Sequence, residues 1–507
     1  MAYEVPFKLN RPDLLETNAY VGGQFVPAQS GSTFEVIDPG TDKPWARVSD
    51  NTAADVSATV QSAHDAFLKY RSISPRTRAQ WLYKWDALIR EHKQDIATIL
   101  VYETGKPLAE AIGELDYSLS FTWWFAGEAE RIQGTAFTPA LPGRRVLTIK
   151  QPLGVAAALV PWNFPIAMVL RKAGAALAAG CTMIVKPSPE TPMSALAVAK
   201  LATEAGFPPG VLNILPTSLE NTPSLSEALC RHPLVKKISF TGSTRVGKLI
   251  ASHCSSTLKK LTLELGGNCP ALVFDDADVG RAAGQLLGLK WRHAGQACVT
   301  VNRFLVQAGI YERFVAHFAA ETARTVVVGH GAGAGATMGP VTTPRGVERA
   351  ERVVADAVAK GARLVCGGKR AAGVVGGAGC EKGYFFEPTI LADMPSGDRA
   401  TLVGCEEVFA PVAAFYRFET EEEAVRLAND TPMGLASYAF TQDVDRLWRL
   451  FENLEAGMIG LNTGNSSAAE SPFGGMKDSG YGKESGKDVA VNEYLVTKTG
   501  TLTVEGV

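Results

Sequence analysis

The residues best suited to covalent chemistry lie in two short segments in the middle of the chain. Cys298 ends the segment 293–298, HAGQAC, whose small neighbouring side chains leave its sulfur accessible. A thiol attacks as its thiolate and forms covalent intermediates. Upstream, Glu264 lies in the apolar segment 262–267, TLELGG, where a carboxylate is costly unless it is paired or takes part in a reaction. Each feature alone is ambiguous, but each is a candidate for catalysis.

A third segment, 240–247 with sequence FTGSTRVG, has the features of a phosphate-binding turn. Gly242 and Gly247 allow close approach of the backbone, and a helix N-terminus offers free N–H groups to a diphosphate. Ser243 or Thr244 can also cap that helix. Because the spacing is not G-x-G-x-x-G, a plain capped turn between a strand and a helix is an open alternative.

Composition excludes several classes of protein. The 507 residues are 46% hydrophobic and 20% charged, with a formal net charge of -2, so neither nucleic acid nor an anionic membrane is an expected partner. No apolar run reaches the ~18 residues of a membrane span. The first residues resemble neither a secretory signal nor a mitochondrial presequence, so we expect a cytoplasmic protein. Eight cysteines without a CxxC or Cys/His cluster predict no metal site.

The elements that must position these residues follow from the hydrophobic pattern. Short apolar runs alternate with helical patterns, which predicts parallel strands covered on both faces, in an open doubly wound α/β sheet. The expected strands are 155–160, 181–185, 211–215, 235–240 and 260–265, with helices at 166–179, 193–205 and 244–253. After Gly266 and Gly267 the alternation resumes and predicts a second α/β domain. Its expected strands are 271–274, 303–306, 412–418, 436–440 and 458–461, with helices at 279–290 and 311–326.

Two further segments, 145–150 and 493–504, fit neither domain. Strands outside the main sheets leave unpaired edges that a partner subunit often covers, so we expect a β oligomerisation arm. A strand packed on its own subunit is the alternative. The expected division is a dinucleotide-binding domain at 1–134 and 154–265, a catalytic domain at 266–485, and an arm at 135–153 and 486–507.

Seven motifs, in order, resemble those of the aldehyde dehydrogenase superfamily over nearly the whole chain. They are 161–165 (PWNFP), 186–188 (KPS), 240–243 (FTGS), 263–267 (LELGG), 295–298 (GQAC), 407–411 (EVFAP) and 471–475 (SPFGG). The order carries the signal more than any single motif.

The resemblance implies a role for each candidate. Cys298 would attack the aldehyde carbon, the Asn163 amide and the Cys298 backbone N–H would hold the oxyanion, and Glu264 would activate water to hydrolyse the thioester. Because Glu264 is present, hydrolysis is favoured over transfer to coenzyme A. The resemblance also implies an NAD(P) cofactor. The residues expected to contact it are Trp162, Lys186, Ser188, Gly242, Ser243, Gly247, Glu407 and Phe409. For Trp162, a place in the hydrophobic core is the alternative.

Within the superfamily the chain most resembles succinate-semialdehyde dehydrogenases, through 237–240 (KISF), 273–278 (VFDDAD), 460–464 (GLNTG) and 492–495 (NEYL). In those enzymes arginines at the positions of Arg171 and Arg292 bind the distal carboxylate of the substrate, to which a guanidinium is well matched. Ser466 or Ser467 is a further candidate contact.

The chain departs from that group at His293 and Thr300, where asparagine and a second cysteine are usual, so no vicinal disulfide switch is expected. Another ω-semialdehyde, or an aromatic or aliphatic aldehyde, is the alternative substrate.

Cofactor choice depends on the position three residues after Lys186. NAD-preferring relatives have a glutamate there that chelates the adenine ribose, whereas this chain has Pro189. The loss of that charge favours NADP over NAD, with Glu190 one residue later as a counter-argument. Two rival functions are a non-catalytic binding protein on this fold, which the intact Asn163, Glu264 and Cys298 argue against, and an esterase that uses Cys298 without a cofactor.

Overall fold

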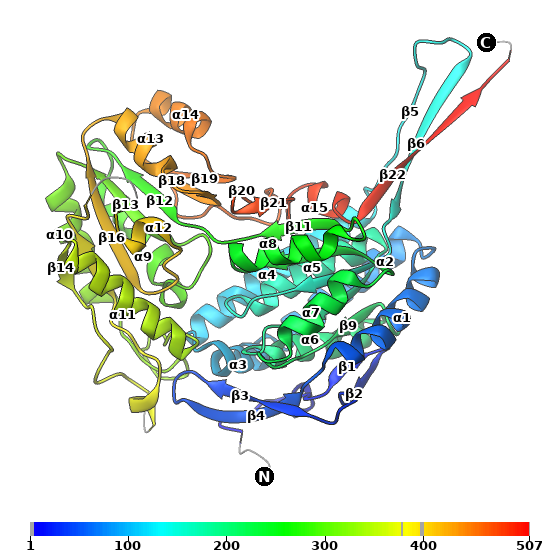
Figure 1. Cartoon of the computed structure of the whole chain (residues 1–507), viewed down its shortest axis with the longest axis horizontal. Coiled ribbons are helices and arrows are strands. Elements are labelled where there is room, and N and C mark those ends of the chain that lie inside the picture. The colour runs from blue at the N-terminus through cyan, green and yellow to red at the C-terminus, as the bar shows by residue number, and fades with distance from the viewer. Residues whose placement is uncertain (1–4, 377–378, 396–399, 506–507) are drawn as a thin grey trace.

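The computed structural model describes residues 5–376, 379–395 and 400–505 (Figure 1). Two α/β units lie side by side, and a three-stranded arm projects from the first of them. Among the described residues, no helix is both long enough and apolar enough to span a membrane.

The first unit is built on an eight-stranded sheet with the order β2-β1-β9-β8-β7-β10-β11-β21. Its five central strands are parallel, as predicted, and β7 and β8 are buried along their whole length, which explains the unbroken apolar sequence of β7 and the apolar centre of β8. The antiparallel edge strands were not predicted. The strands are β1 (Ala19–Val21), β2 (Gln24–Val26), β7 (Val155–Leu159), β8 (Thr182–Lys186), β9 (Leu212–Ile214), β10 (Val235–Thr241), β11 (Lys260–Glu264) and β21 (Gly480–Tyr481).

Helices cover both faces of this sheet, and buried carboxylates cap two of them. Glu114 accepts the backbone N–H groups of Ile166 and Ala167 at 3.0 and 3.3 Å, at the N-terminus of α5, where the helix dipole favours a negative charge. The first four helices were not predicted from the hydrophobic pattern. The helices are α1 (Ala53–Tyr70), α2 (Pro75–Glu91), α3 (Lys93–Thr104), α4 (Leu108–Ala129), α5 (Pro165–Ala179), α6 (Pro192–Ala205), α7 (Thr222–Arg231) and α8 (Thr244–Ser255). A separate hairpin pairs β3 (Thr33–Asp38) with β4 (Lys43–Ser49).

The strand order creates a crevice between β7 and β10. From β7 the chain continues to β8 and β9 on one side, and it then returns to β10 and β11 on the other. Loops leaving the carboxyl ends of such a pair diverge, which is where open α/β sheets bind their ligands. The motifs 161–165 and 240–247 leave the sheet at this point.

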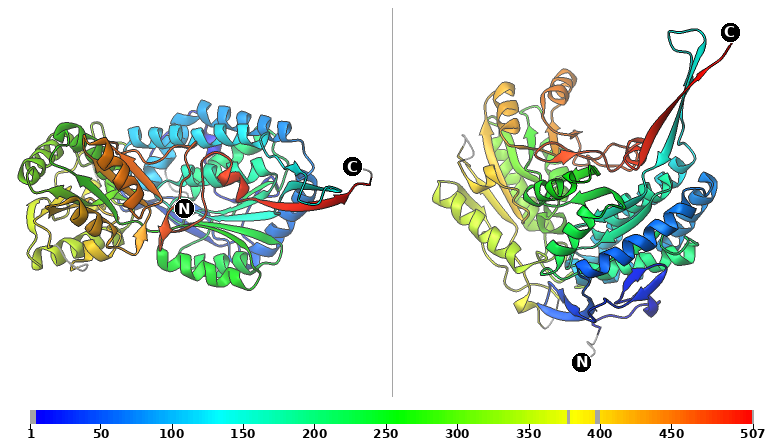
Figure 2. Two further views of the ribbon diagram at one scale, coloured as in Figure 1. Left: turned by 90° about the horizontal axis from the view of Figure 1, so that it is seen from above. Right: turned by 45° about the vertical axis from the view of Figure 1, so that its right-hand side comes forward.

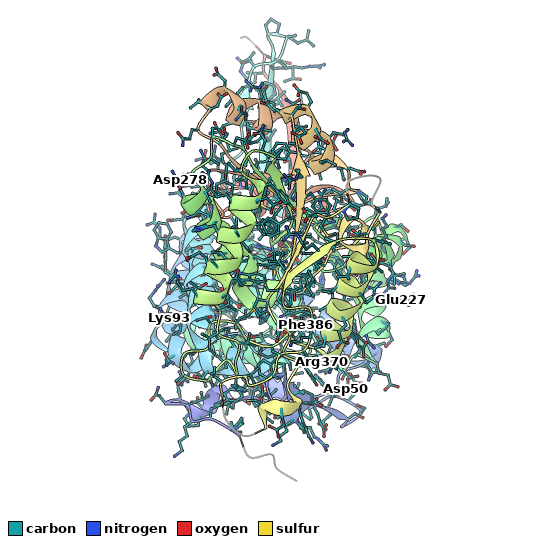
Figure 3. The ribbon with its side chains drawn as sticks, turned by 90° about the vertical axis from the view of Figure 1, so that its left-hand side faces the viewer. Asp50, Lys93, Glu227, Asp278, Arg370 and Phe386 are labelled. Atoms are coloured by element: carbon teal, nitrogen blue, oxygen red, sulfur yellow. The ribbon has the colours of Figure 1, made fainter. Side chains whose placement is uncertain are left out.

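The second unit contains a seven-stranded sheet with the order β14-β15-β16-β13-β12-β18-β19, parallel except at β14. Asp278, labelled in Figure 3, begins α9 by accepting the backbone N–H of Arg281 at 3.0 Å. The strands are β12 (Cys269–Val273), β13 (Val301–Gln307), β14 (Arg363–Cys366), β15 (Thr389–Ala392), β16 (Val412–Phe418), β18 (Ala436–Phe440) and β19 (Met458–Leu461), and a small ladder pairs β17 (Met433–Gly434) with β20 (Met476–Lys477). The helices are α9 (Val279–Trp291), α10 (Tyr311–Thr325), α11 (Pro344–Ala359), α12 (Leu402–Cys405), α13 (Glu421–Asn429) and α14 (Val444–Asn453).

The predicted arm is present as a sheet of β5 (Ala136–Phe137), β6 (Arg144–Pro152) and β22 (Leu495–Thr503). It projects away from the body in both views of Figure 2. Two expected boundaries differ from the structure. Residues 489–492 form a short helix, α15 (Val489–Asn492), that packs against α5, and the strand at 480–481 pairs with β11 in the first sheet. The rest of the domain division stays a prediction.

Candidate functional site

The three predicted catalytic residues meet where the two sheets face each other. Asn163 follows β7, Glu264 ends β11, and Cys298 lies in the loop that precedes β13. The Asn163 Nδ2 donates a hydrogen bond of 3.0 Å to the carbonyl oxygen of Gln296. This bond ties the first unit to the second only two residues from Cys298, so the amide group is held beside the thiol.

Cys298 opens into a cavity of about 530 Å³ between α4, α5, α9 and the loop 464–467. Arg171, Arg292, Ser466 and Ser467, the four predicted substrate contacts, all line it. The structure therefore collects, around one thiol, residues that lie far apart in the sequence.

The electrostatic surroundings keep the Cys298 thiol protonated in the free protein. Burial raises its pKa well above the ordinary value, and the charges of Glu264 and Glu407 raise it further. Arg171 acts in the opposite direction but has a smaller effect. A base must therefore take the thiol proton before or during attack.

Glu264 is placed to be that base. It is almost fully buried, and neither of its carboxylate oxygens has a hydrogen-bond partner among the described residues. Its nearest cation is the Arg171 Nη2, 3.6 Å away. Burial raises the pKa of Glu264, and Arg171 opposes that rise. A buried, unsatisfied carboxylate next to a thiol can accept a proton from the thiol or from water.

Arg171 takes part in a buried ionic network that was not predicted. Its Nη2 lies 2.7 Å from a carboxylate oxygen of Glu484, which also forms an ion pair with Lys172. Lys172 and Arg171 hold the pKa of Glu484 at about 2, against the effect of its burial. The Nε and Nη1 of Arg171 have no hydrogen-bond partner in the described part of the chain, so the guanidinium has donors to spare.

Arg292 differs from Arg171 because it forms no ion pair with a carboxylate in the described part of the chain. Its guanidinium lies over the Phe164 ring at 5.3 Å from the ring centroid, and its Nε is buried without a hydrogen-bond partner among the described residues. Arg292 is half-buried, and a partly desolvated guanidinium binds an anion through charge-assisted hydrogen bonds. The cavity therefore offers an anionic ligand a site that no described side chain occupies.

The two predicted serine contacts are held by tyrosines. The Tyr438 and Ser466 hydroxyls lie 3.1 Å apart, and Tyr117 and Ser467 form a second hydroxyl pair. Both serines are thus oriented at the cavity wall, and which of them contacts substrate stays a prediction.

The residues predicted to bind the adenine ribose lie at the carboxyl end of β8. Lys186 ends β8, and burial lowers its pKa to about 8, while the charge of Glu190 opposes that decrease. The Ser188 hydroxyl donates a hydrogen bond to the Glu190 carboxylate. The acid one residue after Pro189 therefore folds back onto the two groups expected to bind the adenine ribose.

The glycines of the phosphate-binding turn are required for packing. A Cβ at Gly242 would lie 2.6 Å from the Phe240 ring, and a Cβ at Gly247 would lie 2.4 Å from Leu265. These contacts let α8 approach the sheet with its N-terminus at the crevice. Ser243 caps this helix by accepting the Val246 backbone N–H. Direct contact of the three residues with a diphosphate stays a prediction.

On the nicotinamide side, Glu407 and Phe409 lie close to the catalytic loop. The Glu407 carboxylate accepts the Gly267 backbone N–H at 3.1 Å, and burial raises its pKa to about 7. Phe409 has a left-handed backbone (φ 51°) and makes an edge contact with the Trp162 ring, 5.4 Å between centroids. Trp162 is only half-buried, so it is not a core residue.

These residues fit a dinucleotide. A Cβ at Gly266 would come within 3.1 Å of the Glu407 carboxylate, so the glycine lets that carboxylate lie close against the strand end. A capped helix N-terminus, a lysine at a strand end and an aromatic pair complete the set of groups that hold a nicotinamide dinucleotide. The described residues contain no cluster of three or more side chains suited to a metal ion.

Several residues of the cavity were missed in the sequence. Lys106, Glu110, Glu114 and Tyr117 all line it. Lys106 lies just before α4, and the spacing of three or four residues places the other three on one face of that helix. This charged stripe in an otherwise apolar helix is the signal that could have identified them. Glu484 follows a loop of glycines, and its partners on α5 are over 300 residues away, so no local pattern marks it.

Comparisons with known proteins agree with this geometry. The aldehyde dehydrogenase family profile matches residues 25–500. A mitochondrial succinate-semialdehyde dehydrogenase of Hylobates lar is 46% identical over 96% of this chain and 88% of its own length. An enzyme of Schizosaccharomyces pombe named succinate-semialdehyde dehydrogenase [NADP(+)] 1 is 44% identical over 96% of this chain and 94% of its own. A crystal structure of succinate-semialdehyde dehydrogenase from Burkholderia pseudomallei superposes with a TM-score of 0.94, at 43% identity, over 98% of this chain and all of that one.

Proposed function

The chain belongs to the aldehyde dehydrogenase family, and on that premise we propose that it oxidises succinate semialdehyde to succinate with a nicotinamide cofactor. The observation that carries the choice of substrate is the unpaired Arg292 guanidinium in the same cavity as Cys298 and Arg171. The carboxylate of an ω-semialdehyde would supply the missing anion, and a guanidinium binds a carboxylate through two parallel hydrogen bonds. The names of the relatives support the same substrate.

The reaction begins at Cys298. The thiol loses its proton to Glu264, and the sulfur attacks the aldehyde carbon to give a thiohemiacetal. The Asn163 side-chain amide has a second N–H besides the one it donates to Gln296, and with the Cys298 backbone N–H it stabilises the oxyanion. Arg171 and Arg292 hold the far end of the substrate, so that its carbonyl carbon lies at the sulfur.

Lys186, Ser188, Ser243, Glu407, Phe409 and Trp162 are the residues that would hold the cofactor. The chemistry that a bound NAD(P)⁺ supplies is acceptance of one hydride from the carbon attached to sulfur. The product of that oxidation is a thioester on Cys298. Glu264 first gives up to solvent the proton that it took from the thiol. It then takes a proton from water as the water oxygen attacks the thioester carbon, and it returns that proton to the sulfur as the C–S bond breaks to release the acid and the thiol.

For the choice of cofactor, we propose that NADP is preferred. Pro189 removes the glutamate that would repel a 2′-phosphate, and Lys186 and Ser188 are donors that suit one. Glu190 opposes this preference, since its carboxylate accepts the Ser188 hydroxyl. NADP binding therefore requires Glu190 to turn away from Ser188.

We further propose that the arm joins copies of this chain into a dimer or tetramer, and that the protein is cytoplasmic. The arm supports the first proposal because it carries exposed apolar side chains, which a partner subunit would bury. They are Phe137, Leu147, Ile149, Val496 and Leu502. The composition supports the second.

Steady-state kinetics with a panel of aldehydes and both cofactors tests the proposed function. Succinate semialdehyde with NADP should give the highest kcat/KM, above butanal, longer ω-semialdehydes and benzaldehyde. A higher kcat/KM with benzaldehyde or butanal would refute the substrate, and a strong NAD preference would refute the cofactor. Turnover without cofactor would indicate an esterase, and no hydride transfer with any aldehyde would indicate a binding protein.

A further inference from the structure

Glu110 is a carboxylate in the cavity wall for which the reaction described above has no use. It lies in the first turn of α4 and lines the same cavity as Arg292 and Cys298. Its Oε2 accepts the backbone N–H of His293 at 2.8 Å. Glu110 therefore contacts the residue directly after Arg292 in the sequence.

The backbone that Glu110 holds is strained. His293 and Ala294 both have left-handed conformations, with φ of 50° and 51°, which are unfavourable for residues other than glycine. Gln296 holds the other side of this turn, because its backbone N–H and its side-chain amide both donate to the His293 carbonyl, at 3.0 and 2.9 Å. The turn lies between Arg292 and Cys298, so it sets the direction of both side chains.

The charges around Glu110 are few. Lys106 forms a buried ion pair with Glu114, and Arg171 is paired with Glu484, so both cations are largely balanced. His293 is uncharged, because burial and the nearby cations lower its pKa well below the ordinary value. Arg292 has no ion-pair partner among the described residues. Glu110 is thus the carboxyl group that decides how much positive charge the Arg292 side of the cavity presents.

We propose that Glu110 is a positioning and specificity-determining residue: it anchors the strained turn that orients Arg292, and its charge state sets the affinity of the cavity for an anionic aldehyde. This inference rests on the proposed function. Burial raises the pKa of Glu110 to about 7, with the His293 N–H, Lys106 and Arg292 acting against that rise.

The sign of the effect follows from this pKa. Below pH 7 Glu110 is mainly neutral, and Arg292 is free to bind a carboxylate. Above pH 7 Glu110 is ionised, repels an anionic substrate and partly offsets the charge of Arg292. The KM for an anionic semialdehyde should therefore rise as the pH rises through 7, whereas the KM for a neutral aldehyde should not.

The test compares the KM for succinate semialdehyde with that for butanal, at saturating cofactor, across the neutral range of pH. The ratio of the two values cancels the titration of Cys298 and Glu264, which act on both substrates. For the unmodified enzyme this ratio of KM values should rise about fivefold as the pH is raised from about one pH unit below neutrality to about one and a half pH units above it. In Glu110→Gln, which keeps the hydrogen-bond acceptor but not the charge, the ratio should stay flat and low.

Two further variants separate charge from anchoring. Glu110→Ala loses the hydrogen bond to His293 as well, so kcat should fall for both substrates while the ratio stays flat. Arg292→Leu should move the rise of the ratio to higher pH with Glu110 intact, because Arg292 no longer lowers the pKa of Glu110, and this keeps the test valid if the Glu110 variants do not fold. Glu128→Gln is the matched control, because Glu128 is a buried glutamate at the far end of the same helix. It should behave as the unmodified enzyme.

A Glu110→Gln enzyme whose ratio still rises fivefold with pH would overturn the inference and leave the proposed function intact. A different failure, in which the unmodified enzyme shows no preference for the anionic substrate at any pH, would overturn the proposed function itself.

Discussion

The charged groups are arranged in opposite ways in the cavity at Cys298 and in the corner formed by Lys186, Ser188 and Glu190, which we propose binds the adenine ribose. In the cavity, Arg292 has no carboxylate partner among the described residues, and Arg171 keeps two unused donors. In the corner, the Ser188 hydroxyl is already bound to Glu190, whose charge also acts on Lys186.

This contrast explains why one ligand is specified more clearly than the other. A half-buried cation without an anionic partner is stabilised by a ligand of opposite charge, so its presence in the cavity indicates the chemistry of that ligand. A donor that already has a partner within the chain loses one interaction when it gains another. The cavity therefore indicates a carboxylate-bearing aldehyde, and the corner only favours NADP over NAD.

The largest effect should come from replacing the sulfur of Cys298, which lies in the cavity wall. Cys298→Ser should reduce kcat by at least about 10⁴-fold with any aldehyde, because the hydroxyl is a far weaker nucleophile in the same place. Binding of cofactor, followed by quenching of tryptophan fluorescence, should be retained. Cys366→Ser, which changes a cysteine of β14 outside the site, serves as the control and should keep full activity.

A smaller effect should follow from removing the unpaired cation. Arg292→Leu should raise the KM for succinate semialdehyde about 10²-fold, the value of one charge-assisted pair, and change that for butanal less than threefold. The control is Arg281→Gln, which changes an exposed arginine at the start of α9, the helix that ends immediately before Arg292. Equal changes for the two substrates would mean that Arg292 binds no carboxylate.

Arg171 should respond differently, because its loss breaks a buried network. Arg171→Leu leaves Glu484 with Lys172 alone, so the variant should lose about 3 kcal/mol of the free energy of unfolding, whereas Arg292→Leu should lose little. Chemical denaturation of both variants measures this difference. If the two are equally stable, the distinction between a paired and an unpaired arginine has no energetic consequence.

The smallest effect belongs to the corner. Glu190→Gln should raise kcat/KM for NADP about fivefold and change that for NAD less, because a charge that repels the 2′-phosphate is removed. Glu220→Gln, an exposed glutamate of the same unit, is the matched control. An unchanged ratio of the two cofactors would show that the Glu190 carboxylate lies away from the 2′ position.

The sequence predicted the central strands of both sheets well, because buried parallel strands are continuous apolar runs, as 155–160 and 412–418 illustrate. It also predicted the arm, whose strands fit neither sheet. The helices from 53 to 129 were missed, since their patterns carry no motif and the alternation of strand and helix does not extend to them.

At the site, Cys298, Glu264 and Asn163 each belong to a local motif, and the structure places these motifs close together, while the predicted roles of nucleophile, base and oxyanion-binding amide stay predictions. Partners that are distant in the sequence could not be predicted. They are Glu484, which forms an ion pair with Arg171, and Glu110, which accepts the backbone N–H of His293. Which arginine is paired depends on tertiary structure alone. For the same reason, the return of Glu190 onto Ser188 could not be read from the spacing after Lys186.

The central claim is that one sulfur carries the substrate until Glu264 releases it. Glu264→Gln, mixed with succinate semialdehyde and cofactor, should produce one equivalent of reduced cofactor in a burst and then stall. Intact-protein mass spectrometry of the quenched mixture should show one added succinyl group, and peptide mapping should place it on Cys298. An adduct on another residue, or full turnover with no adduct, would contradict the account.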